Sequence, residues 1–227
     1  MRRFVVLDAM GVLYRHGNVV AGLLIPYLRA HGCTATEPEI RETYRRCTLG
    51  EISTHQLWSS LGVAATANDA GYCAQHQLNP GAREALEQLH QAGITPLVLT
   101  NDAAAWSRIL RTRFDLYAER WYVSSEIGAR KPSPEAFRAV RSHPGLDPAE
   151  TVLVDDRPTN LIAARRPVSV RWFSPARTPP STRSRGSARR QSAVCGSWQL
   201  SSSDQEAQVF WQSAQVPKIS RVWLMSA

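Results

Sequence analysis

Polar residues that could take part in phosphoryl transfer follow four short apolar runs of this sequence. Each run has the length of a strand, and each ends in, or is soon followed by, an acid, a hydroxyl, an amide or a cation. These residues are Asp8, Thr100, Asn101, Arg130, Lys131, Asp155 and Asp156. In an open parallel sheet, ligands bind at the edge formed by the carboxyl ends of the strands. We therefore expect three carboxylates, a hydroxyl and an ammonium group to meet at one edge of one sheet.

Such a set of side chains suits the transfer of a phosphoryl group. A carboxylate can attack phosphorus and form an acyl phosphate, which divides one difficult step into two easier ones. A nearby pair of acids can hold Mg²⁺, which prefers oxygen ligands, and the cation offsets the repulsion between two anionic reactants. A hydroxyl and a lysine can bind the transferring oxygens as negative charge develops on them.

The elements that must position these residues alternate between strands and helices. The apolar runs predict strands at residues 3–8, 94–100, 120–125 and 151–155. Helix starts are predicted at Asn79, at Asn101 or Asp102, at Ser133 and at Pro158, from their capping residues and prolines. Strands that alternate with helices at this spacing predict an α/β fold, with a parallel sheet covered by helices on both faces.

Residues 15–78 interrupt this alternation with a helical pattern. Two capping boxes, at Thr36–Glu39 and Ser53–Gln56, each precede apolar residues at helical spacing. We therefore expect a core made of residues 1–14 and 79–173, with a small all-helical cap of residues 15–78 inserted after the first strand. Residues 174–227 are expected to form a basic, disordered or atypical tail, because the stretch that follows Ser174 is rich in Ser, Arg, Pro and Thr.

Composition limits the class of protein. The chain has 227 residues, 43% of them apolar, and no apolar run approaches the roughly 18 residues that a membrane helix needs. Asp8 interrupts the first apolar run, which favours a cytoplasmic protein over a secreted one. The four cysteines form no C-x-x-C pair, so neither a disulfide framework nor a zinc site is expected.

The net charge of +8 lies mainly in the tail. Residues 166–227 hold nine Lys or Arg but two Asp or Glu, whereas the preceding residues are nearly balanced. A nucleic-acid contact by the tail is a weak alternative, because its arginines form no recognised motif and few aromatic residues are interleaved with them. The charge therefore says little about the partner of the main domain.

Four motifs in order resemble those of the haloacid dehalogenase superfamily of hydrolases, in its helical-cap subclass. The first is "DAMGVLY" from Asp8, and the second is "LVLTN" ending at Asn101. The third is "GARKPSPEAF" at residues 128–137, and the fourth is "VLVDDRPTNLIAAR" at residues 152–165. The resemblance covers roughly residues 4–165 and implies a Rossmann-like core with a cap that selects the substrate.

The resemblance also implies a role for each matching residue. Asp8 would be the nucleophile and a Mg²⁺ ligand, and the main-chain carbonyl of Met10, Asp155 and Asp156 would complete the metal site. Thr100, Asn101 and Lys131 would bind the phosphate. The implied function is a Mg²⁺-dependent phosphatase that forms an aspartyl phosphate and acts on a small phosphorylated metabolite.

Met10 departs from this pattern. Phosphatases of the resembled family have a second aspartate at this position, which protonates the leaving group and activates water, and a thioether can do neither. Loss of a general acid or base typically costs about 10²–10⁴-fold in rate. Two alternatives therefore stay open: a ligand-binding protein that has lost efficient catalysis, and a dehalogenase-type hydrolase, since dehalogenating members also lack this aspartate.

Overall fold

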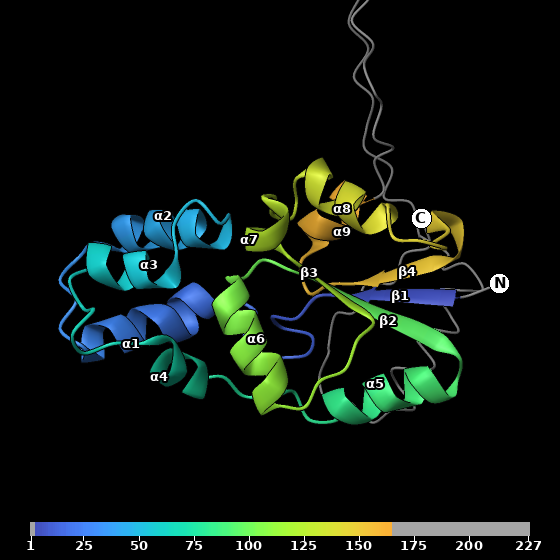
Figure 1. Cartoon of the computed structure of the whole chain (residues 1–227), viewed down its shortest axis with the longest axis horizontal. Coiled ribbons are helices and arrows are strands. Elements are labelled where there is room, and N and C mark those ends of the chain that lie inside the picture. The colour runs from blue at the N-terminus through green and yellow to red at the C-terminus, as the bar shows by residue number, and fades with distance from the viewer. Residues whose placement is uncertain (1–2, 165–227) are drawn as a thin grey trace, which may run out of the picture.

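The computed structural model describes residues 3–164 of the chain. The tail predicted at residues 174–227, and the last part of the predicted core, lie outside the described residues. Within them, the predicted alternation of strands and helices is confirmed (Figure 1).

The four described strands form one parallel sheet. They are β1 (Arg3–Leu7), β2 (Ile94–Thr100), β3 (Arg120–Val123) and β4 (Thr151–Val154), in the spatial order β3-β2-β1-β4. The register pairs Leu7 with both Val98 and Val154, so β1 lies in the interior of the sheet. The fold is therefore an α/β fold of the Rossmann-like type, as the sequence predicted.

Helices cover both faces of this sheet. They are α5 (Ala82–Gln91) and α6 (Ala104–Arg113) on one face, and α7 (Ser124–Ile127), α8 (Pro134–Arg141) and α9 (Pro158–Ala164) toward the other (Figure 1). Val5 and Leu7 belong to one hydrophobic cluster, whereas Phe4 and Val6 belong to a second one. Successive side chains of a strand point to opposite faces, so β1 is apolar on both sides because both sides are covered.

A group of helices follows β1 and lies beyond the carboxyl ends of the strands (Figure 1). It comprises η1 (Val20–Leu24), α1 (Ile25–Ala30), α2 (Glu37–Thr48), α3 (Thr54–Ser60) and α4 (Asp69–Ala74). Both predicted capping boxes are present at the starts of α2 and α3. The division of the chain into a core and a substrate-selecting cap stays a prediction.

Four predicted boundaries are wrong by one to three residues. The third strand ends at Val123, because the hydroxyl of Ser124 turns away to accept from the amide of Asp102 at 3.0 Å. Helix α5 begins at Ala82, after Gly81 at φ +80°, and the Asn79 side chain donates instead to the Val12 carbonyl at 2.7 Å. β1 and β4 end at Leu7 and Val154, so Asp8 and Asp155 directly follow their strands.

The chain between β4 and its helix is short. η2 (Pro148–Glu150) precedes β4, and Pro158 opens α9 four residues after the strand ends. A short loop leaves Asp155, Asp156 and Arg157 little freedom, so these side chains are held close to the edge of the sheet. Among the described helices, none has the length and apolar character needed to span a bilayer.

Candidate active site

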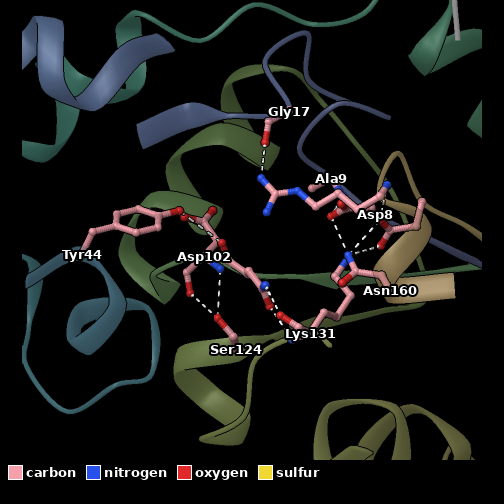
Figure 2. Close-up of polar contacts among 11 residues, drawn as sticks. Asp8, Ala9, Gly17, Tyr44, Asp102, Ser124, Lys131 and Asn160 are labelled. Atoms are coloured by element: carbon pink, nitrogen blue, oxygen red, sulfur yellow. Dashed lines mark hydrogen bonds and ion pairs between the residues drawn. The ribbon is translucent and has the colours of Figure 1, made fainter. Parts of the chain in front are cut away.

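The predicted nucleophile, lysine and first acid of the motif pair meet at the carboxyl edge of the sheet. The Nζ atom of Lys131 lies 2.9 Å from Oδ1 of Asp8 and 2.7 Å from Oδ2 of Asp155 (Figure 2). All three residues are buried. Because Asp8 and Asp155 follow adjacent parallel strands, a residue spacing of 147 in sequence becomes direct contact through one ammonium group.

Asp156 joins Asp8 and Asp155 in a cluster of three carboxylates. One oxygen of each lies within 4.8 Å of the others. The Oδ1 atom of Asp156 is buried without a hydrogen-bond partner among the described residues. Three converging carboxylates, one with an unused buried oxygen, fit the oxygen ligands that Mg²⁺ prefers.

Thr100 ends β2 at the same edge, where its side chain is fully buried. Its Oγ1 atom has no hydrogen-bond partner among the described residues. Buried hydroxyls are nearly always hydrogen-bonded, so this one is available to a bound oxyanion.

Asn101 occupies a different position from the one expected of a free phosphate donor. Its amide nitrogen donates to the carbonyl of Lys131, and its amide oxygen accepts from the Lys131 amide, both at 2.8 Å. This pair of bonds fixes the loop that presents Lys131. A direct contact of Asn101 with phosphate stays a prediction.

Asn160 is a residue whose role the sequence did not reveal. Its Nδ2 atom lies 2.8 Å from Oδ1 and 3.0 Å from Oδ2 of Asp155, and the Arg157 amide donates to the same Oδ1 (Figure 2). These bonds orient the Asp155 carboxylate. The signal was its place five residues after Asp155 on the first turn of a helix, but spacing alone does not say which atom a side chain contacts.

The electrostatics of the site reflect its burial. Burial raises the pKa of Asp8 to about 7, against the opposing charge of Lys131. For Lys131, burial acts to lower the pKa, but the carboxylates of Asp8 and Asp155 outweigh it and the pKa is raised. Lys131 is therefore a cation at neutral pH, and a second cation at this edge would favour the ionised, nucleophilic form of Asp8.

A cavity of about 220 Å³ opens in front of Asp8. Met10 lines it, so the residue beside the nucleophile faces the space where a substrate would react. Helix α2 contributes Tyr44, which is buried and donates its hydroxyl hydrogen to the Asn101 carbonyl at 3.3 Å (Figure 2). Residues of the helical group thus form part of the wall, which the sequence could not specify.

Gly17 allows Asp156 to take its position. A methyl group at Gly17 would collide with the Asp156 carboxylate. We expect Gly17→Ala to displace this carboxylate and to weaken Mg²⁺ binding by about tenfold, the scale on which supporting residues of metal sites act. Titration calorimetry with Mg²⁺ measures this.

Gly22→Ala is the matched control, since its added methyl group would meet the His16 ring instead of a carboxylate. Equal Mg²⁺ affinity in Gly17→Ala and the unaltered protein would show that Asp156 is not a ligand.

Asp102 is another buried acid near the site. Burial raises its pKa to about 8, although the amide of Ala103 donates to its Oδ1. Its Oδ2 has no partner among the described residues. The folded protein therefore keeps a proton on Asp102 that the unfolded chain, with a pKa near 3.8, releases.

This difference predicts a pH-dependent effect of Asp102→Asn on stability. A raised pKa contributes stability that is lost as pH rises from about 4 to about 8, and asparagine lacks this loss. We expect the variant to gain up to about 4 kcal/mol relative to the unaltered protein between pH 5 and pH 8.

Urea unfolding at the two pH values measures the gain. Asp115→Asn, at an exposed aspartate, is the control and should show no comparable change. An unchanged difference for Asp102→Asn would mean that Asp102 is ionised in the folded state.

The comparisons with known proteins agree with this architecture. The model of the haloacid dehalogenase-like hydrolase family matches residues 3–166. The chain therefore belongs to the haloacid dehalogenase-like hydrolases, as the four motifs indicated.

Curated relatives are named as phosphatases. A glyceraldehyde 3-phosphate phosphatase from Pyrococcus abyssi is 31% identical over 120 residues, which are 51% of this chain and 50% of the relative. A sesquiterpene phosphatase from Aspergillus oryzae is 32% identical over 138 residues, 55% of this chain and 68% of the relative. The chain spans about half the length of the first of these relatives.

Solved structures share the fold. A haloacid dehalogenase family enzyme from Bacteroides thetaiotaomicron, solved in complex with magnesium, superposes with a TM-score of 0.61 at 21% identity, covering 72% of this chain and 88% of that one. An L-2-haloacid dehalogenase from Xanthobacter autotrophicus superposes with a TM-score of 0.50 at 20% identity, covering 73% and 74%. At these identities the likeness concerns the fold.

Proposed function

We propose that the protein is a Mg²⁺-dependent phosphatase acting on a small phosphorylated metabolite through an aspartyl phosphate on Asp8. The observation that supports this most is the contact of Lys131 with Asp8 and Asp155 beside the third carboxylate of Asp156. The names of the curated relatives support the same reaction class.

The residues would divide the work as follows. A carboxylate oxygen of Asp8 attacks phosphorus, and the bond from phosphorus to the leaving alcohol breaks. Lys131 and the free hydroxyl of Thr100 bind the phosphoryl oxygens as charge develops. Water then attacks the acyl phosphate, which releases inorganic phosphate and restores Asp8.

Asp8, Asp155, Asp156 and the main-chain carbonyl of Met10 would hold Mg²⁺. When bound, the cation would neutralise the approaching phosphate and lower the repulsion from Asp8. Asn160 and the Arg157 amide would keep Asp155 oriented for this task.

The proposed site lacks a side chain at position 10 that could give a proton to the leaving group. Met10 cannot donate it, so the leaving oxygen would take its proton from water. This supports slow turnover, and it also favours the second candidate function, a protein that binds a phosphorylated ligand without efficient catalysis.

Phosphate release from a panel of phosphomonoesters, with Mg²⁺ and with EDTA, tests the proposal. Release that requires Mg²⁺ would support the phosphatase. A folded protein that binds inorganic phosphate with Mg²⁺ but releases none from the panel would favour the binding function. Chloride release from 2-chloropropionate without metal would favour the dehalogenase instead.

A further inference from the structure

The cavity in front of Asp8 has an excess of positive charge. Its lining includes one carboxylate, that of Asp8, together with Lys131 and a group of arginines that we call the arginine wall. The wall consists of Arg41, Arg45, Arg130 and Arg157. It gathers from α2, from the loop before Lys131 and from the loop after β4, which are far apart in the sequence.

The reacting end of the site does not need all of this charge. Lys131 and one divalent cation together balance the carboxylates of Asp8, Asp155 and Asp156. Burial keeps the nearby Asp102 protonated at neutral pH, since its pKa is about 8. A bound phosphoryl group brings roughly two further negative charges, so about half of the arginine wall exceeds the charge that the acids and this group require.

Two members of the wall have no carboxylate partner among the described residues. Arg130 is partly buried, donates to the hydroxyl of Thr48, and places its guanidinium carbon 5.4 Å from the centre of the Tyr44 ring. Arg157 is exposed and donates from Nη2 to the carbonyl of Gly17 at 2.9 Å. These contacts hold both side chains at the cavity without a direct ion pair, although Arg130 and Arg157 still interact at longer range with Asp102 and Asp156.

The other two members are paired only at the surface. Arg41 lies 3.4 Å from Glu37, and Arg45 lies 2.7 Å from Glu42, with all four side chains about half exposed. The exposed Arg41–Glu37 pair is a single contact of the kind that is worth little, so Arg41 can readily turn toward an anion. Arg45 is held more firmly, because Glu42 accepts two hydrogen bonds from it and Glu51 lies 3.5 Å away. An arginine guanidinium binds carboxylate and phosphate with two parallel hydrogen bonds.

We propose that the arginine wall binds a second anionic group of the substrate, so that the preferred substrate is a small phosphomonoester that also bears a carboxylate or a second phosphoryl group. This inference rests on the proposed phosphatase function, because it places the first phosphoryl group at Asp8 and Lys131. Lys131 and the arginine wall line the same cavity, so both anionic groups would lie within one site.

Matched phosphonates test the inference without turnover, because their carbon–phosphorus bond is not a phosphate ester. The probes are 3-phosphonopropionate, propane-1,3-diphosphonate and butylphosphonate, which share a phosphonate but differ at the other end. With Mg²⁺ present, we expect the two doubly anionic probes to bind at least about tenfold more tightly than butylphosphonate, the scale of a charge-assisted contact. The tighter of the two identifies the second group as carboxylate or phosphoryl.

Variants of the arginines test whether the arginine wall causes the tighter binding of the doubly anionic probes. Arg130→Gln should reduce the difference between probes, while butylphosphonate binds as before. Arg157→Gln should also reduce the difference, and it keeps the main-chain amide that donates to Asp155. Arg130→Lys should keep part of the difference. Arg46→Gln is the control, because Arg46 lies on the same helix and pairs with Glu51 but does not line the cavity.

The outcomes separate this inference from the function on which it rests. Equal binding of all three probes, or a difference that survives in both glutamine variants, would overturn the second-anion site. If phosphomonoesters are hydrolysed in that case, the phosphatase stands and only the arginine wall loses its role. If no phosphonate binds and no phosphate is released, both proposals fail.

Discussion

Asp8→Asn is expected to abolish phosphate release, by at least about 10⁴-fold, because an amide oxygen does not form an acyl phosphate under these conditions. Asparagine keeps the size of the side chain. Its carbonyl oxygen can still accept from Lys131, which lies 2.9 Å from Asp8 Oδ1. The expected loss therefore concerns the reaction and not the fold. Malachite green detection of released phosphate, with saturating Mg²⁺, measures it.

Asp69→Asn is a control for the removal of a hydrogen-bonded carboxylate elsewhere, at a partly buried position. Asp69 accepts from the indole nitrogens of Trp58 and Trp106, both at 2.8 Å, within the helical group. We expect that variant to lose stability and to keep the reaction in the fraction that is folded. Unchanged phosphate release in a folded Asp8→Asn protein would refute the nucleophile assignment.

Met10→Asp is expected to raise the rate of phosphate release by about 10²–10⁴-fold, the usual contribution of a general acid or base. Met10 is buried and lines the cavity beside Asp8. A carboxyl group at this position would lie at the cavity in which the leaving oxygen is expected. The carboxylates of Asp8, Asp155 and Asp156 would raise its pKa, which suits a group that must first give a proton to the alcohol and later accept one from water.

Met10→Asn separates proton transfer from polarity. Asparagine has the shape of aspartate but does not titrate near neutral pH, so it should leave the rate close to that of the unaltered protein. Comparison of kcat for the three proteins on one phosphomonoester gives the result. A rate for Met10→Asp no higher than that for Met10→Asn would mean that the site lacks more than a general acid, and would favour the binding function.

The two predictions together distinguish three states of the site. If phosphate release depends on Asp8 and Met10→Asp accelerates it, the site is intact and proton transfer limits its rate. If only Met10→Asp releases phosphate, the site lacks a single catalytic group, the general acid or base. If neither the unaltered protein nor Met10→Asp releases phosphate but both bind phosphonate, the protein is a binding protein on a hydrolase fold.

The sequence by itself determined the fold class and the approximate place of each motif. A strand buried on both faces must be apolar throughout, and a polar residue can stand only where the strand ends. The runs before Asp8 and Asp155 meet this condition, whereas the run before Thr100 contains the buried Thr95 at the second position of β2. The coincidence of a cap and a proline predicted the helix start correctly at Ser133 and Pro134, but not at Asn79 and Pro80, where the helix begins at Ala82.

The sequence could not determine which side chains share a contact. Asn79 reads as a helix cap, yet its amide reaches back to the Val12 carbonyl. Asn101 is predicted to bind phosphate, and the sequence did not show its second role, in which both ends of its amide bind the main chain of Lys131. In both cases a short polar side chain can form hydrogen bonds with groups that are near in the sequence or far from it. Only the packing of the chain determines which of these groups it contacts.

Tertiary structure alone decided the environment in front of Asp8. Arg41 and Arg130 are 89 positions apart and belong to patterns that look like a solvated helix face and a loop, but both line one cavity. Composition places most of the net positive charge in the tail, and local spacing does not reveal a cluster formed across three segments. These arginines lie close together because the parallel sheet brings its strand ends to one edge, and because α2 lies against the cavity at that edge.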